Sequence, residues 1–210
     1  MNDMIVEFLI KALVLFTALP VHEFAHGWVA TKFGDDTPRI QGRLTLSPFV
    51  HLDIIGSLCM LFTGFGWAKP VMVNKSKFKH RKIGSICVAL AGPLANILLA
   101  LIVMIIIKSL EFAHIDMNSN LHWVFWYLIV LNTGLAVFNL LPVPPLDGSQ
   151  VLLAVLSPKV QYKVMQYQMY IFIGLLLFIQ LPFVQYIITW LNLYLFSLLD
   201  YITSFIGRWV

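Results

Sequence analysis

Charged side chains are scarce in this sequence of 210 residues, where Asp, Glu, Lys and Arg together make up 11%. A soluble domain normally carries about 25%. Residues 84–107, 121–146 and 164–199 contain none of the four. Because 60% of the chain is hydrophobic, a water-soluble fold of this size has too little interior to hide its apolar side chains. The composition therefore excludes a soluble domain and favours a lipid environment.

Cysteine is also sparse. The chain has only Cys59 and Cys87, both in apolar stretches and without a CxxC pair, and we interpret them as small buried residues rather than a disulfide or cysteine metal site. The formal net charge is only +4, and the bases cluster beside the apolar runs. We therefore expect no nucleic-acid partner, and we interpret these bases as residues that orient the chain in a lipid bilayer.

The long apolar runs predict an all-α polytopic membrane protein. A spanning helix needs roughly 20 apolar residues, which predicts spans over about 4–31, 84–108 and 121–141. The last run would form a helix about 54 Å long, although the hydrocarbon core is only about 30 Å thick. It must break, and Leu181-Pro182 is the predicted place, leaving spans over about 164–181 and 183–203. About five transmembrane helices then form one domain, residues 1–210, with a core over about 4–157 and a C-terminal helical pair over about 164–205.

Residues 33–82 do not read as one span. Residues 39–46 alternate in part and residues 68–73 could pair with them, which predicts a short membrane-associated β-hairpin. Between them, residues 54–67 are apolar but too short to cross, which favours a re-entrant or interfacial segment. All the flanking bases then lie on one side of the membrane, which the positive-inside rule assigns to the cytoplasm. Because the first predicted span ends on that side, the N-terminus lies on the external side. These bases are Lys32, Arg39, Arg43, Lys75, Lys77, Lys79, Arg81 and Lys82.

The first predicted helix contains the HExxH motif His22-Glu23-Phe24-Ala25-His26. A separation of four residues places both imidazoles on one helix face, one turn apart, where they can share a metal ion. Zinc accepts neutral imidazole nitrogen, and Glu23 lies where a carboxylate can take a proton from metal-bound water. Ionisable groups inside a membrane segment are costly and usually functional. The alternative is a polar cluster that only joins helices.

A catalytic zinc ion needs a third protein ligand. Asp147 follows the third predicted span on the cytoplasmic side, in the half of the bilayer that holds the two histidines. The prolines just before it break the helix and Gly148 relaxes the turn, so that the carboxylate can point at a metal. His51 and Asp53 compete as ligands but lie in the irregular region. Asp147 could alternatively do no more than cap the following short helix.

These motifs together resemble a known family. HExxH in a membrane helix, followed much later by the NxxPxxxxDG pattern from Asn139 to Gly148, resembles the site-2 protease family of intramembrane zinc metalloproteases. The stretch from Gly92 to Asn96 is similar to that family's GPxxN feature, and residues 46–53 and 66–71 resemble its small bacterial members. The resemblance covers about residues 18–157 and includes no recognisable PDZ or CBS domain.

The resemblance implies one Zn²⁺ per chain, held by His22, His26 and Asp147, with Glu23 as the catalytic residue that activates water. It implies that Asn139 holds substrate or the developing oxyanion, and the GPxxN feature adds Asn96 as a second candidate.

The implied function is hydrolysis of peptide bonds in or near transmembrane segments, for regulated intramembrane proteolysis or clearance of remnant signal peptides. The substrates would be single-span membrane proteins or signal peptides. The implied location is the cell membrane, as a multi-pass protein with its zinc site toward the cytoplasmic leaflet. Two alternatives stay open: a zinc-dependent binding or chaperone protein that does not cut, and an ion transporter that uses the same polar cluster. The oligomeric state does not follow from the sequence.

Overall fold

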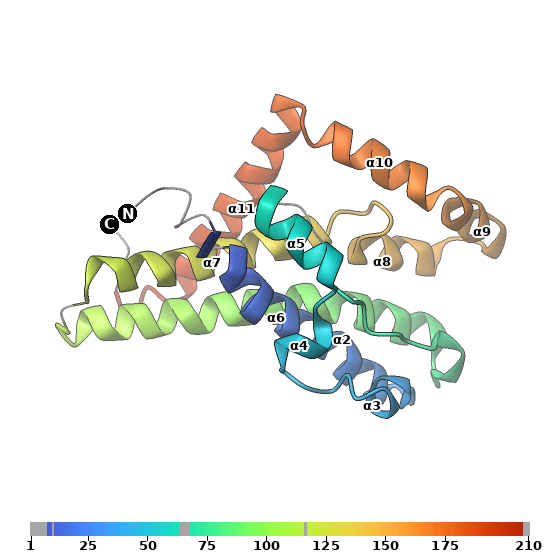
Figure 1. Ribbon diagram of the computed structural model, residues 1–210, viewed down its shortest axis with the longest axis horizontal. Coiled ribbons are helices and arrows are strands. Elements are labelled where there is room, and N and C mark those ends of the chain that lie inside the picture. The colour runs from blue at the N-terminus through green and yellow to red at the C-terminus, as the bar shows by residue number, and fades with distance from the viewer. Residues whose placement is uncertain (1–7, 10, 64–67, 116, 208–210) are drawn as a thin grey trace.

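The structure, a computed structural model, describes residues 8–9, 11–63, 68–115 and 117–207. Helices make up most of it (Figure 1). In chain order they are the π-helical turn η1 (Val14–Ala18), α2 (Leu19–Lys32), α3 (Thr37–Ile40), α4 (Pro48–His51), α5 (Ile54–Thr63), the 3₁₀ turn η2 (Lys75–Lys77), α6 (Arg81–Phe112), α7 (Ser119–Asn139), α8 (Asp147–Val155), α9 (Pro158–Gln166), α10 (Gln168–Phe178) and α11 (Pro182–Ile202).

Three of the described helices, α6, α7 and α11, are long and apolar enough to cross a membrane. They match the second, third and fifth predicted spans, and α11 begins at Pro182, where the break was expected. The count of five is not confirmed. The fourth predicted span is divided at Tyr167 between α9 and the 11-residue α10. The first is helical over residues 11–32 but includes the turn η1, and residues 4–7 lie outside the described residues.

The region between α2 and α6 differs from the predicted β-hairpin. Pro38 lies in the first turn of α3, and Gly42, with φ at 67°, turns the chain just beyond that helix. Within the described part of the chain, strand-like pairing is limited to one antiparallel bridge between Leu52 and Ala68. The hairpin is therefore not confirmed. The ten-residue helix α5 is too short to cross, which agrees with a re-entrant or interfacial segment, although residues 64–67 lie outside the described residues.

The core is centred on α6, against which α2, α7 and α8 pack. Helices α6 and α7 run antiparallel and side by side, and α2 lies against α6 (Figure 1). Small buried residues on α6, such as Gly84 and Gly92, let neighbouring elements approach closely. Near the other end of α6 an apolar cluster joins α6, α7 and α11, formed by Ala100, Val103, Met104, Ile107, Ile129 and Leu199.

Candidate metal centre

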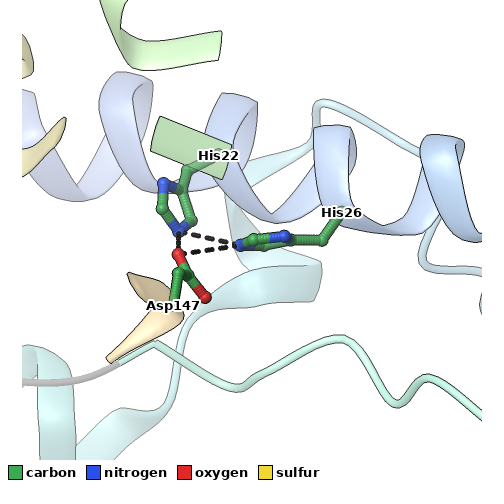
Figure 2. Close-up of side chains that lie close together, drawn as sticks. All are labelled: His22, His26 and Asp147. Carbon is green, nitrogen blue, oxygen red and sulfur yellow. Dashed lines mark hydrogen bonds and ion pairs between the residues drawn. The ribbon is translucent and has the colours of Figure 1, made fainter. Parts of the chain in front are cut away.

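Three side chains from two distant parts of the chain converge beside α6 (Figure 2): His22, His26 and Asp147. The two Nε2 atoms lie 3.0 Å apart, and Asp147 Oδ2 lies 3.1 Å from His22 Nε2 and 3.2 Å from His26 Nε2. Ligands bonded at about 2.0–2.2 Å in a tetrahedral zinc site stand roughly 3.3 Å apart. The triangle therefore has nearly the size that one zinc ion requires, as the motif predicts.

The outer nitrogens of both imidazoles face hydrogen-bond acceptors. His22 Nδ1 lies 2.6 Å from Asn96 Oδ1, and His26 Nδ1 lies 2.6 Å from the backbone oxygen of Val88. Each Nδ1 is therefore placed to donate a hydrogen bond, which leaves Nε2 of a neutral imidazole available to a metal ion. Two imidazole nitrogens and a carboxylate oxygen meet in a buried space, an arrangement that a cation between them would stabilise. The donors and their protonation fit a metal ion.

Helix α2 holds both histidines against α6. The buried residues of α2 include His22, His26 and Ala30, which follow one another at intervals of four and so share one face. Opposite them lies Gly92 of α6, where an added Cβ would stand 2.6 Å from His22 Nε2. A glycine at this position keeps open the space between the helices in which a metal ion would lie.

Asp147 reaches the histidines because of the turn that precedes it. It is the first residue of α8, and Leu146 occupies the N-cap position. The interpretation of Asp147 as the cap is therefore wrong. The loop after α7 folds back closely on α8, so that a Cβ on Gly148 would stand 2.7 Å from the backbone oxygen of Leu141. Gly148 thus permits the turn that directs the Asp147 carboxylate towards α2.

Glu23 lies next to the ligand pair and contacts the non-helical segment of residues 69–74. Its Oε2 accepts a hydrogen bond of 2.9 Å from the backbone N–H of Val71. The same segment is anchored at Asn74, whose backbone N–H donates to Oδ2 of the fully buried Asp35 at 2.6 Å. A non-helical stretch of backbone is therefore held alongside the residue expected to act as the base.

The competing ligand candidates do not join this cluster. His51 is fully buried, with Nε2 at 2.8 Å from the backbone oxygen of Thr45. Asp53 Oδ1 accepts a 2.8 Å hydrogen bond from the backbone N–H of Gly56 in the first turn of α5. Asp147, and not these two residues, completes the donor set.

Asn139 and Asn96, the two candidates for substrate or oxyanion contact, lie in different surroundings. Asn139 is partly exposed at the end of α7, and its Nδ2 donates to the backbone oxygen of Leu135 in the same helix. Asn96 is fully buried and faces Nδ1 of His22, on the opposite side of the ring from Nε2. That placement does not suit substrate contact, and it makes Asn96 a support for His22.

Sequence reasoning missed Asn132. This residue of α7 is fully buried, and its Oδ1 accepts a 2.9 Å hydrogen bond from Asn96 Nδ2. The available signal was an amide within an apolar run that has no charged residue, because polar groups in membrane segments are costly. The same argument singled out His22 but was not applied to this asparagine.

Comparisons with known proteins agree with this geometry. The chain matches the family model described as Peptidase family M50 over residues 10–116 and 113–179. It is 39% identical over 180 residues to YwhC of Bacillus subtilis, covering 84% of this chain and 82% of that protein. It is 32% identical over 153 residues to Rip2 of Mycobacterium tuberculosis, covering 69% of this chain and 56% of that protein. It is 31% identical over 156 residues to MJ0611 of Methanocaldococcus jannaschii, covering 72% of this chain and 73% of that protein.

All three relatives carry zinc metalloprotease in their names. No solved structure gives a significant match. The family match covers most of the chain, and the donor set found here is one that could hold the zinc ion those names specify. The chain belongs to peptidase family M50, the site-2 protease family that its motifs resemble.

Proposed function

We propose that this protein is an intramembrane zinc metalloprotease that hydrolyses peptide bonds in or beside the transmembrane segments of other membrane proteins. The observation that carries the proposal is the convergence of His22, His26 and Asp147, with Glu23 beside them, in a chain whose described residues include three candidate membrane spans. Membership of family M50 and the names of the relatives support it.

Each residue of the site has a defined task. His22, His26 and Asp147 hold the zinc ion through one imidazole nitrogen each and one carboxylate oxygen, the usual number of protein ligands in a catalytic zinc site. Zinc, when bound, supplies the Lewis acidity that activates water and polarises the scissile carbonyl. Glu23 accepts the proton of the attacking water and passes it to the leaving amine. Asn139, which has a second N–H besides the one bonded to Leu135, donates to the developing oxyanion, a contribution of about 3 kcal/mol in comparable sites.

The substrate is a single-span membrane protein or a remnant signal peptide. A transmembrane helix satisfies its backbone hydrogen bonds internally, so it must unwind before a peptide bond can be attacked. Residues 69–74 lie outside the helices, Val71 donates to Glu23, and Met72, between Val71 and the anchored Asn74, is 61% exposed. We propose that the unwound substrate lies along this segment as an added strand, which would bring it beside the general base.

The site faces the cytoplasmic leaflet of the cell membrane in this proposal. Five bases between residues 75 and 82 stand in η2 and around the start of α6, and the positive-inside rule assigns that end of α6 to the cytoplasm. The helical stretch 11–32 is about 33 Å long, enough to cross together with α6, α7 and α11.

The decisive variant is Glu23→Gln, which removes the base and keeps all three zinc ligands. Wild type and variant are purified with metal analysis and compared in cleavage of a panel of single-span substrates. Loss of a general base lowers the rate by about 10²–10⁴-fold, and we expect bound zinc to be retained. Glu111→Gln, at the far end of α6, is the matched control and keeps full cleavage.

Equal cleavage by wild type and Glu23→Gln would refute the mechanism. The alternatives give other results. A zinc-binding or chaperone protein that does not cut would tolerate Glu23→Gln without loss of function. A transporter would move ions across sealed vesicles and release no peptide product.

A further inference from the structure

A series of side-chain hydrogen bonds links the metal centre to α7. His22 Nδ1 lies 2.6 Å from Asn96 Oδ1, Asn96 Nδ2 donates to Asn132 Oδ1 at 2.9 Å, and Asn132 Nδ2 donates to the backbone oxygen of Leu128 at 2.8 Å. Both asparagines are fully buried. Helices α2, α6 and α7 are therefore connected through two amides in series that end on a metal ligand.

Each amide in this series has one orientation that satisfies its polar atoms. Because Leu128 offers a carbonyl oxygen, Asn132 points its NH₂ group there and its oxygen towards α6. Asn96 then turns its NH₂ group towards two acceptors, Asn132 Oδ1 and the backbone oxygen of Ala18 at 3.2 Å, and its oxygen towards His22. The reverse orientation of Asn96 would place oxygen against oxygen in a buried space, which costs more than a lost hydrogen bond.

We propose that Asn132 is a positioning residue of the metal centre. Through Asn96 it holds the imidazole of His22 with the proton on Nδ1 and the lone pair of Nε2 directed at the metal. The inference rests on the zinc site of the proposed function but not on peptide cleavage. Outer partners of metal-bound histidines typically contribute 10–100-fold to metal affinity. Asn132 acts through one further bond and shares the orientation of Asn96 with Ala18, so we expect about tenfold.

A purely structural role for Asn132 would have different consequences. Its bond to Asn96 would then only join α7 to α6, as interhelical polar pairs do in membranes, and its removal would change stability without changing zinc affinity. Thr133 provides the matched control, because it is the next residue, is fully buried, and within the described residues bonds to Ile129 and Val130 of its own helix.

The test measures the zinc dissociation constant of the full-length protein in detergent, by competition with a chelator. The variants are Asn132→Leu, Asn96→Leu, their combination, and Thr133→Val. We expect about tenfold weaker binding for Asn132→Leu, a larger loss for Asn96→Leu, and no further loss in the double variant, because Asn132 acts only through Asn96. Thr133→Val binds zinc like wild type. The absorption spectrum of the Co²⁺-loaded protein shifts in Asn132→Leu and not in Thr133→Val.

Unchanged zinc affinity in folded Asn132→Leu, or additive losses in the double variant, would overturn the inference. If Asn132→Leu does not fold, Asn132→Ser carries the same expectation, because its hydroxyl can bond to its own helix but cannot reach Asn96. A protein that binds zinc with this pattern but cuts no peptide would refute the proposed function and leave this inference standing.

Discussion

The helices around the metal centre and the C-terminal helices differ in what they bury. Buried residues follow one another along the length of α6 and include Asn96 and Lys108. In contrast, α9 buries none of its residues and α10 buries only Leu175. In Figure 1, α10 extends away from the pair formed by α6 and α7. One region thus encloses polar groups, and the other exposes apolar side chains.

This difference shows what each region demands of its residues. Around the metal centre every polar atom needs a partner at a defined distance, so a single added methyl group disturbs the packing and the hydrogen bonds. The C-terminal helices expose many large aromatic side chains, as expected for a surface in contact with lipid. Such a surface requires mainly that its side chains be apolar. These side chains include Tyr170, Phe178, Phe183, Tyr186, Trp190 and Tyr194. Equal substitutions in the two regions should therefore have unequal effects.

The largest effect is expected for Gly92→Ala. The added Cβ would stand 2.5 Å from Cε1 and 2.6 Å from Nε2 of His22, far inside van der Waals contact, so the imidazole or α6 must move. We expect zinc affinity to fall by more than 100-fold, which corresponds to about 3 kcal/mol, and proteolysis to fall with it. Chelator competition measures the affinity. Zinc binding equal to that of wild type would show that the helices separate there without disturbing the site.

The next effect tests the connection between the two regions. Lys108 of α6 is buried, and its Nζ bonds to Oδ1 and to the backbone oxygen of Asp200 in α11. Removing one partner of a fully buried ion pair costs about 3–5 kcal/mol, and the cost here is lower because the Asp200 side chain is 22% exposed. We expect Lys108→Met to lower thermal stability in detergent strongly. Zinc affinity should remain unchanged, because Lys108 lies about 24 Å along α6 from Gly92.

The double variant Lys108→Met/Asp200→Asn provides the control, since it removes both charges together. It should recover part of the lost stability, because the Asp200 carboxylate no longer faces a position that has lost its ammonium group. A thermal unfolding temperature of Lys108→Met equal to that of wild type would mean that the pair does not hold α11 to the core.

The ligand pair could be predicted from the sequence because its geometry is local. Four residues along a helix bring His22 and His26 to one face whatever the rest of the chain does. The start of α11 at Pro182 is also local, because proline lacks the N–H that a continuing helix needs. Predicting Asp147 as the third ligand required more than helix geometry, since its position depends on how the chain turns after α7. The prolines before it and Gly148 after it favour such a turn, and this is why Asp147 could be predicted.

The remaining features depend on contacts that the sequence does not contain. Partial alternation predicted a strand over residues 39–46. The structure instead has the short helix α3, with Pro38 in its first turn and Gly42 just after its end. The pairing of Asn96 with Asn132 depends on how α6 and α7 are rotated about their axes. That rotation is set by packing along both helices, which no local pattern specifies.

A smaller effect is expected at the anchor of the segment beside Glu23. Burial by itself raises the pKa of Asp35, but hydrogen bonds from Thr37 and from the backbone of Asn74, with Lys77 nearby, outweigh it and leave the pKa lowered. Asp35→Asn should cost roughly 1–2 kcal/mol of folding stability at neutral pH, as expected for lost charge-assisted hydrogen bonds. The measurement is thermal unfolding in detergent.

The pH dependence has a definite sign. Because the folded-state pKa of Asp35 is lowered, its contribution is present above the unfolded value of about 3.9 and is lost as the pH falls through the folded value. The penalty of Asp35→Asn should therefore shrink in acid. Asp36→Asn is the control, because Asp36 pairs with Arg39 at the surface, where ion pairs contribute little. A penalty of equal size at neutral and acid pH would contradict this account.

The smallest effect, with the opposite sign, is expected for Gly174→Ala in α10. An added Cβ at Gly174 meets no atom of the described chain within 4 Å, and alanine is a better helix former than glycine by up to about 1 kcal/mol. We expect unchanged zinc affinity and a thermal unfolding temperature equal to or slightly above that of wild type. Paired with Gly92→Ala, this variant makes the same chemical change in both regions. A loss of zinc binding in Gly174→Ala would mean that α10 packs near the metal centre in the working protein, and the contrast between the regions would fail.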